Sequence, residues 1–155
     1  GDSSRMFFIG KTPRKAARLV DVTYEAMMLG IDAVRPGATL GDIGHAIQGF
    51  AEKQRCSVVR DFCGPGIGKI FHDAPSILHY GKPGAGMELH EGMFFTIEPM
   101  INLGRFEVKI LNDGWTAVTK DRSLSAQFEH TIGVTSNGCE IFTSSPNGLD
   151  RPPYG

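Results

Sequence analysis

The sequence predicts an α+β domain in which two helices cover one face of an antiparallel sheet. Two stretches near the N-terminus repeat apolar residues at helical spacing. After them come short apolar runs that are separated by turn signals, among them Asp113-Gly114 and Asn137-Gly138. Because the helices precede the strands and do not alternate with them, the order favours α+β over a parallel α/β fold.

Composition limits the classes of protein that fit. With 155 residues, of which 41% are hydrophobic and 21% charged, we expect one hydrophobic core. The net charge of -1 and the lack of any Lys or Arg run argue against nucleic-acid binding. The three cysteines leave an odd thiol in any disulfide scheme, which favours a reducing compartment. No apolar run reaches membrane-spanning length, so we expect no membrane association and a cytoplasmic location.

The helical half of the chain has recognisable boundaries. Residues 6–9 predict a first strand, and Thr12 then offers an N-cap with Pro13 at the first helical position. Apolar residues recur from there to Pro36-Gly37, which ends the helix. A second helix is expected to begin at Thr39 and to end near residue 55. We assign both helices to packing and not to chemistry.

The remainder of the chain reads as strands and turns. A glycine-rich turn at 63–68 fits neither a P-loop nor a dinucleotide fingerprint. We divide the chain into a folded part, 1–143, and an irregular, loosely ordered tail, 144–155, which holds three prolines. The predicted strands are 57–62, 94–100, 106–111, 115–119, 127–135 and 139–143.

Two glutamates stand in strands that otherwise look buried. Glu98 lies among aromatic and aliphatic residues and shares a strand face with Thr96. Glu129 likewise shares a face with Gln127 and Thr131. Two buried carboxylates repel each other unless a cation lies between them. The alternative is that each glutamate pairs with an Arg or Lys, or faces water on an edge strand.

An oxygen-rich set of candidate ligands follows, made of Asp2, Glu98 and Glu129. Such a set suits Mn, Fe, Co or Zn in a hydrolytic site better than a closed structural zinc site. His72, after the glycine-rich turn, is a candidate hydrogen-bond donor or proton shuttle, although it also fits an exposed loop histidine. His79 and His130 are expected to be structural.

Several motifs closely resemble the type I methionine aminopeptidases over residues 1–143. They are Gly1-Asp2-Ser3-Ser4, Cys63-Gly64-x-Gly66-Ile67-Gly68, Phe71-His72, Phe95-Thr96-Ile97-Glu98-Pro99-Met100, Asp113-Gly114-Trp115 and the run from Thr119 to Thr131. The resemblance implies a pita-bread fold, here partial, with two divalent metal ions drawn from Co, Mn, Fe or Zn. It also implies removal of the initiator methionine from nascent polypeptides, with the peptide N-terminus as substrate and the ribosome as a candidate partner.

The resemblance also implies roles for individual residues. Asp2 and Glu129 match metal ligands, and Glu98 matches a ligand that also handles the proton of the attacking water. His72 matches a histidine that contacts the substrate near the scissile amide. Phe62, Phe71 and Trp115 match side chains around a methionine pocket. Thr96 and Gln127 match residues that support the metal ligands.

Two departures from the family pattern bear on activity. Pro65 occupies the position of an imidazole ligand and has no lone pair to offer. The half of the fold that bears another metal aspartate and a second substrate-binding histidine is expected to be missing. Since loss of a supporting partner alone costs about 10 to 100-fold in affinity or activity, we expect this chain to be close to inactive. An unpaired edge at residues 6–9 would also favour self-association.

Two other readings remain open at this point. Pro65 favours a catalytically dead pita-bread binding module, whereas retention of clustered acids that repel each other opposes it. A creatinase-type or proline-specific relative is the other reading. The run from Ser123 to Thr131 resembles the methionine enzymes more closely.

Overall fold

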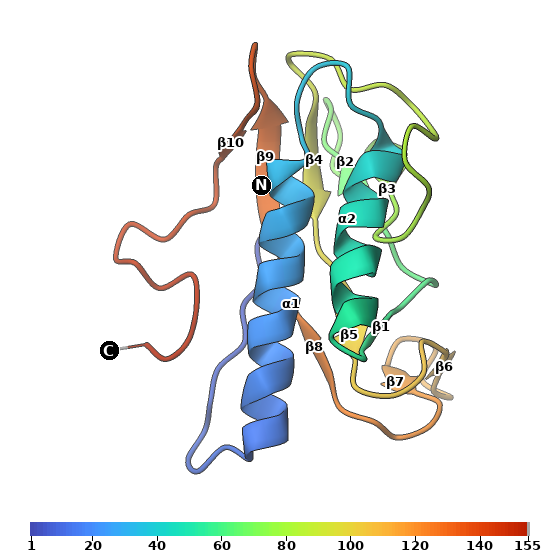
Figure 1. Ribbon diagram of the computed structural model, residues 1–155, viewed down its shortest axis with the longest axis vertical. Helices are drawn as coiled ribbons and strands as arrows, with labels where there is room; N and C mark the ends of the chain where they lie inside the picture. Colours follow the sequence, from blue (N-terminus) through green and yellow to red (C-terminus); the bar gives the residue numbers. More distant parts are fainter. Residues whose placement is uncertain (155) are drawn as a thin grey trace.

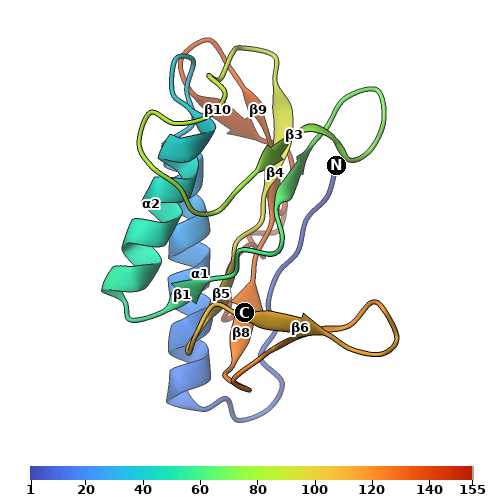
Figure 2. The same cartoon turned by 90° about the vertical axis from the view of Figure 1, so that its right-hand side faces the viewer.

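The computed structural model describes residues 1–154, which form a layer of two helices against antiparallel strands (Figures 1 and 2). The predicted α+β class is confirmed. The helices are α1 (Arg14–Asp32) and α2 (Leu40–Lys53). Within the described residues, neither is long and apolar enough to span a membrane.

Helix α2 begins as its sequence predicts, and α1 begins one residue later than expected. The Thr39 side chain accepts from the Asp42 N–H, while Asp42 accepts from the Thr39 N–H at 2.8 Å, which completes a capping box. In α1 the N-cap is Pro13, with no side-chain cap bond, so the assignment of Thr12 as the cap is wrong. Proline lacks an N–H but its fixed φ still permits this position.

The larger sheet has five antiparallel strands in the order β10-β9-β4-β2-β3. Its strands are β2 (Gly64–Gly66), β3 (Asp73–Ile77), β4 (Phe94–Ile97), β9 (His130–Val134) and β10 (Cys139–Ile141). The predicted glycine-rich turn is therefore wrong in part, because its centre is strand β2. A side chain at position 64 would collide with the Thr96 carbonyl, so glycine there lets β2 approach β4 closely.

Two smaller sheets complete the strand layer. The first has the order β1-β5-β8, and the second is the β6-β7 hairpin, which projects from the body of the molecule (Figure 2). The predicted turn at Asp113-Gly114 closes that hairpin, with Gly114 at a φ of 70°. The strands are β1 (Ser57–Val58), β5 (Met100–Asn102), β6 (Val108–Ile110), β7 (Ala117–Thr119) and β8 (Ser125–Gln127).

Two strands that the sequence predicts as continuous are each broken at a glutamate. Glu98-Pro99 separates β4 from β5, and Phe128-Glu129 separates β8 from β9. Pro99 has no N–H for a ladder, which explains the first break. Both carboxylates thus lie where the chain passes between the five-stranded and the three-stranded sheet.

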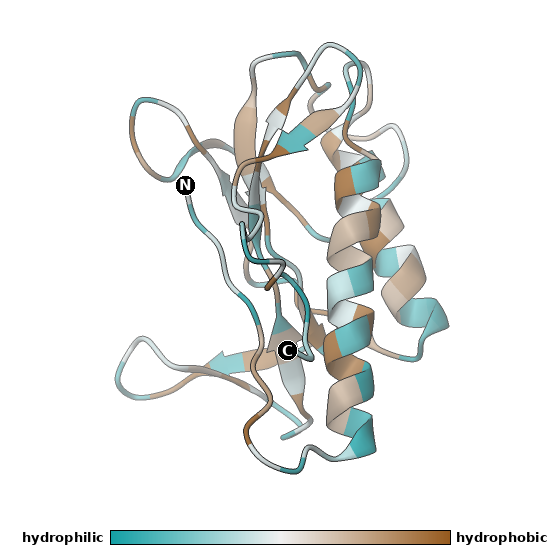
Figure 3. Ribbon diagram, turned by 90° about the vertical axis from the view of Figure 1, so that its left-hand side faces the viewer, coloured by the Kyte–Doolittle hydropathy of each residue, from teal (hydrophilic) through white to brown (hydrophobic). Residues whose placement is uncertain are grey.

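Both chain ends differ from expectation. The predicted strand at 6–9 is wrong, because residues 6–9 belong to no strand. The nearby β-bridge joins Ser4 to Glu129. Phe7 is 62% exposed and Ile9 89% exposed. Figure 3 shows the N-terminal segment running along the outside of the molecule. Residues 144–154 form no helix or strand, and the Tyr154 hydroxyl attaches them to the N-terminal segment by donating to the Met6 carbonyl oxygen at 2.9 Å.

The core lies between the helices and the strand layer. It is built from aliphatic and aromatic side chains on the inner helix faces and on the central strands. Among its largest fully buried members are Leu19, Met27, Ile43, Ile47, Phe95, Ile97, Ile101, Phe128 and Ile132. The outer side of β4 and β9 is left for the polar residues described next.

Candidate functional site

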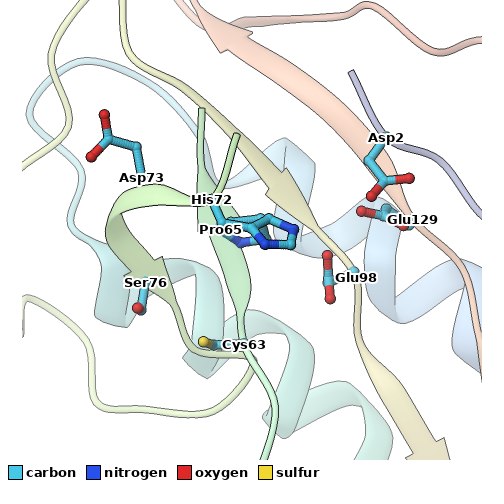
Figure 4. Close-up of a pocket in the computed structure, with 8 residues that line it drawn as sticks. All are labelled: Asp2, Cys63, Pro65, His72, Asp73, Ser76, Glu98 and Glu129. Carbon is cyan, nitrogen blue, oxygen red and sulfur yellow. The ribbon is translucent and has the colours of Figure 1, made fainter. Parts of the chain in front are cut away.

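An acidic cavity of about 390 Å³ opens on the strand layer (Figure 4). One side, here the acidic wall, consists of Asp2, Glu98 and Glu129. The other side, here the proline wall, consists of Cys63, Pro65, His72, Asp73 and Ser76. The three sequence-predicted ligands are thus brought to one cavity, together with His72 and the departure at Pro65.

Glu98 is held through both its side chain and its backbone. The Thr96 hydroxyl donates to Glu98 Oε2 at 2.9 Å, as expected for a supporting residue. The Gln127 amide approaches the Glu98 carbonyl oxygen at 3.5 Å, a longer contact. The Glu98 N–H donates to His79 Nε2 at 3.0 Å. Complete burial lowers the pKa of His79 to about 3, so the imidazole stays neutral and can accept this bond.

Support of Glu98 by His79 was missed in the sequence. The signal was weak: His79 lies two residues beyond Ile77, the last residue of β3, and both side chains are buried. Recognising the acceptor role needs the position of Glu98, which lies 19 residues away in the chain.

Glu129 is buried without a Lys or Arg partner. Its side chain is 6% exposed, and Oε1 has no hydrogen-bond partner. Burial raises the pKa of Glu129 well above its usual value, and its contact with Glu98 and the charge of Asp2 raise it further. Ion pairs within residues 1–154 involve Arg105 and Arg151 only, and neither reaches this cavity. The alternative of a Lys or Arg partner is therefore not what the structure shows.

Asp2 reaches the cavity because the N-terminal segment runs beside β9. Ser4 and Glu129 exchange backbone hydrogen bonds of 3.3 and 3.0 Å. The Thr131 hydroxyl contacts both backbone polar groups of Asp2 at 2.7 Å. Figure 4 shows the carboxylates of Asp2 and Glu129 next to each other, with Glu98 on the neighbouring strand.

The proline wall is more open. Pro65 faces the cavity from β2, and His72 lies beyond it in the connection to β3. His72 is exposed and has a φ of 64°, which a side chain other than glycine adopts infrequently. Its ring lies 4.1 Å from that of Phe71. His72 is thus accessible to a molecule in the cavity.

The residues expected around a methionine pocket do not line this cavity. Phe71 is 53% exposed and Trp115, at the hairpin, is 88% exposed. Phe62 is half-buried beside Cys63. Their role in a methionine pocket stays a prediction.

The acidic wall fits a divalent cation in its chemistry. It offers carboxylate oxygens, a buried unpartnered oxygen on Glu129 and no basic partner, which are the features of a site for a hard cation. Within the described part of the chain, no three His, Cys, Asp or Glu side chains converge closely enough to define a coordination geometry. Pro65 does not fit, because it offers no donor on the opposite wall.

Comparison with known proteins identifies the family. The model of metallopeptidase family M24 matches residues 1–136. The chain belongs to metallopeptidase family M24. Membership of M24 implies the use of divalent metal ions, in agreement with the chemistry of the acidic wall.

Among M24 relatives, this chain is similar to methionine aminopeptidases. It is 63% identical over 155 residues to the methionine aminopeptidase of Rickettsia prowazekii, and this match covers 99% of the chain and 60% of the relative. It is 52% identical over 143 residues to the methionine aminopeptidase of Escherichia coli K12, covering 92% of the chain and 54% of the relative. The chain thus spans little more than half the length of these relatives.

Solved structures confirm the pita-bread fold. The crystal structure of the Rickettsia prowazekii enzyme superposes with a TM-score of 0.91 at 62% identity, over 92% of this chain and 58% of that one. The Thermotoga maritima methionine aminopeptidase gives 0.91 at 43% identity, over 94% and 58%. Prolidase from Pyrococcus furiosus, at 21% identity and a TM-score of 0.67 over 91% and 36%, shows the fold alone.

Proposed function

We propose that this chain carries the acidic half of a methionine aminopeptidase site, which removes the initiator methionine from nascent polypeptides. The observation that supports this most is the acidic wall, where Glu129 is buried with an unpartnered oxygen and no cation from the chain. Similarity to enzymes named methionine aminopeptidase supplies the reaction.

Asp2, Glu98 and Glu129 would hold the metal, with Mn, Co, Fe or Zn as candidates and two ions expected. When bound, divalent metal ions lower the pKa of water and polarise a carbonyl group. Glu98 is the residue we assign to proton transfer, because it is half-buried, reaches the cavity and is fixed by Thr96 and His79.

His72 is assigned to the substrate. Its imidazole is exposed at the mouth of the cavity and can donate a hydrogen bond to the oxygen of the scissile amide. A peptide N-terminus is cationic when protonated, and the four carboxylates that line the cavity would attract it. The chain itself would be impaired, because Pro65 supplies no donor where the family pattern has an imidazole.

The decisive experiment is hydrolysis of Met-Ala-Ser and of an Xaa-Pro peptide, with Mn²⁺ added, by the chain and its Pro65→His variant. We expect little hydrolysis by the parent chain and measurable release of Met by the variant. The double variant Pro65→His with Glu98→Gln is the control and should be inactive. Cleavage of the Xaa-Pro peptide alone would contradict the proposal.

Pro65 is the one observation that favours a second candidate, a pita-bread binding module without catalysis. That candidate predicts peptide binding with neither Mn²⁺ uptake nor hydrolysis, in the parent chain and in Pro65→His alike. The uncompensated carboxylates of the acidic wall oppose it, because without a cation they repel each other.

A further inference from the structure

Thr131, in β9, lies two residues beyond Glu129, and its hydroxyl contacts the second residue of the chain. The Asp2 N–H donates to Thr131 Oγ1 at 2.7 Å, and Thr131 Oγ1 donates to the Asp2 carbonyl oxygen at 2.7 Å. One hydroxyl, with one proton and two lone pairs, therefore serves both backbone polar groups of Asp2. Thr131 is 5% exposed, so little water is available to replace it.

Strand register explains why these two residues meet. Ser4 and Glu129 form an antiparallel bridge, with backbone bonds in both directions. The same register places Asp2, two residues before Ser4, opposite Thr131, two residues after Glu129. A regular ladder would be expected to bring the Asp2 backbone next to the Thr131 backbone.

The Thr131 backbone is already occupied by the chain that follows β10. The Phe142 N–H donates to the Thr131 carbonyl oxygen at 2.9 Å. The Thr131 N–H donates to Thr143 Oγ1 at 3.0 Å. With both groups engaged, the Thr131 backbone is not available to Asp2, and the side-chain hydroxyl takes its place.

We infer that Thr131 is a positioning residue, which fixes the Asp2 carboxylate beside Glu129 through the Asp2 backbone and thereby sets the affinity of the acidic wall for a divalent cation. The inference rests on the proposed function in one respect, since it takes Asp2 as a metal ligand. Thr131 contacts Asp2 through the Asp2 backbone alone. The Asp2 carboxylate accepts from the Ser3 N–H at 2.9 Å through Oδ1, which leaves Oδ2 for a cation.

Matched variants separate the hydroxyl from the shape of the side chain. Thr131→Val keeps the branched shape and removes the hydroxyl, and we expect Mn²⁺ affinity, measured by isothermal titration calorimetry, to fall about 10 to 100-fold. Thr131→Ser keeps the hydroxyl and should stay within about threefold of the parent chain. Thr23→Val is the control, because Thr23 is also buried and its hydroxyl donates to the Leu19 carbonyl oxygen at 2.7 Å, in α1. It should leave Mn²⁺ affinity unchanged.

The Asp2→Asn variant distinguishes the positioning role of Thr131 from the proposed metal site itself. If Asp2→Asn weakens Mn²⁺ binding and Thr131→Val does not, the positioning role is wrong and the proposed site stands. If Asp2→Asn leaves Mn²⁺ affinity unchanged, Asp2 is not a ligand and the proposed site is wrong at that residue.

A measurement on the metal-free chain tests whether Thr131 positions Asp2, whatever the metal affinities are. Trypsin cleavage after Arg5 in the metal-free chain should be faster in Thr131→Val than in the parent, because the segment before it has lost an anchor. It should be unchanged in Thr131→Ser and Thr23→Val. Equal cleavage rates in all four chains would overturn the inference.

Discussion

On the acidic wall of the cavity, the carboxylates are fixed by neighbours from separate parts of the chain, whereas on the proline wall the side chains are largely exposed. Glu98 is held by Thr96 and His79, and Asp2 is held by Thr131. Pro65 makes no polar contact through its ring, and His72 stands on an exposed connection. The comparison teaches that one wall gathers acids without a basic partner from the described residues, whereas the proline ring on the other wall offers no donor.

Removal of a carboxylate from the acidic wall should have the largest effect. Glu129→Gln keeps the shape of the side chain and removes its charge, so Mn²⁺ affinity should fall more than about 100-fold, since even supporting residues cost 10 to 100-fold. The metal-free variant should unfold at a higher temperature than the parent, because its acids repel less. Calorimetry measures both quantities.

Glu140→Gln is the matched control, since Glu140 is an exposed carboxylate on β10. It should leave Mn²⁺ binding unchanged. A Glu129→Gln chain that kept parental affinity would show that the acidic wall does not bind the cation.

Restoring a donor on the proline wall should strengthen binding. The Pro65 ring faces the cavity, so Pro65→His would place an imidazole there, and we expect Mn²⁺ affinity to rise at least about 10-fold. Pro65→Ala removes the ring without adding a donor and should give no gain. An equal gain in both variants would mean that the proline ring obstructs the site and that the missing lone pair is not the cause.

Loss of the His79 acceptor should weaken both the fold and the acidic wall. His79→Leu leaves the Glu98 N–H without a partner in the core, which should lower the free energy of unfolding by about 2 kcal/mol. Mn²⁺ affinity should fall about 10-fold, because Glu98 is no longer fixed. Urea titration and calorimetry measure the two effects, and exposed His45 provides the control as His45→Leu.

A change at the start of α2 should lower the stability of the fold without changing the cation affinity of the acidic wall or the proline wall. Backbone N–H donors, first that of Thr39 and then that of Gly84, lower the pKa of Asp42 below its ordinary value of 3.8. A carboxyl group whose pKa is lower in the folded state than in the unfolded state stabilises the protein at pH values above its unfolded-state pKa. This contribution disappears as pH falls through the folded-state pKa.

Asp42→Asn should therefore lower the free energy of unfolding by about 0.5 to 1 kcal/mol at pH 7. The difference from the parent should shrink as pH falls below 3.8 and through the lower folded-state pKa of Asp42, as measured by urea titration at several pH values. Mn²⁺ affinity at pH 7 should be unchanged. Asp61→Asn, at an exposed position, is the control and should leave the free energy of unfolding at pH 7 unchanged.

Local signals predicted the helices and much of the acidic wall. The Thr39 capping box and the Asp113-Gly114 turn depend on residues that are close in the chain, so the sequence reveals them. Alternation also indicates that Thr96 and Thr131 point to the same side of the strand layer as Glu98 and Glu129. Strand β3 was missed, because Gly and Pro around Asp73–Ile77 resemble a loop and its pairing partner is another short strand rich in Gly and Pro.

Long-range support could not be predicted. His79 and Thr131 acquire their roles from partners that lie 19 and 129 positions away in the chain. The same limit explains the strand breaks, since nothing local to Phe128-Glu129 shows that the chain changes sheets there. Tertiary packing decided each of these features.

The contact between Asp2 and Thr131 also has a consequence for biosynthesis. A ribosome synthesises Asp2 before Thr131, and 129 further positions must be translated before this partner exists. Until β9 has left the exit tunnel, Asp2 has neither Thr131 nor Glu129 beside it. The acidic wall can therefore assemble only after the residues of β9 have been synthesised.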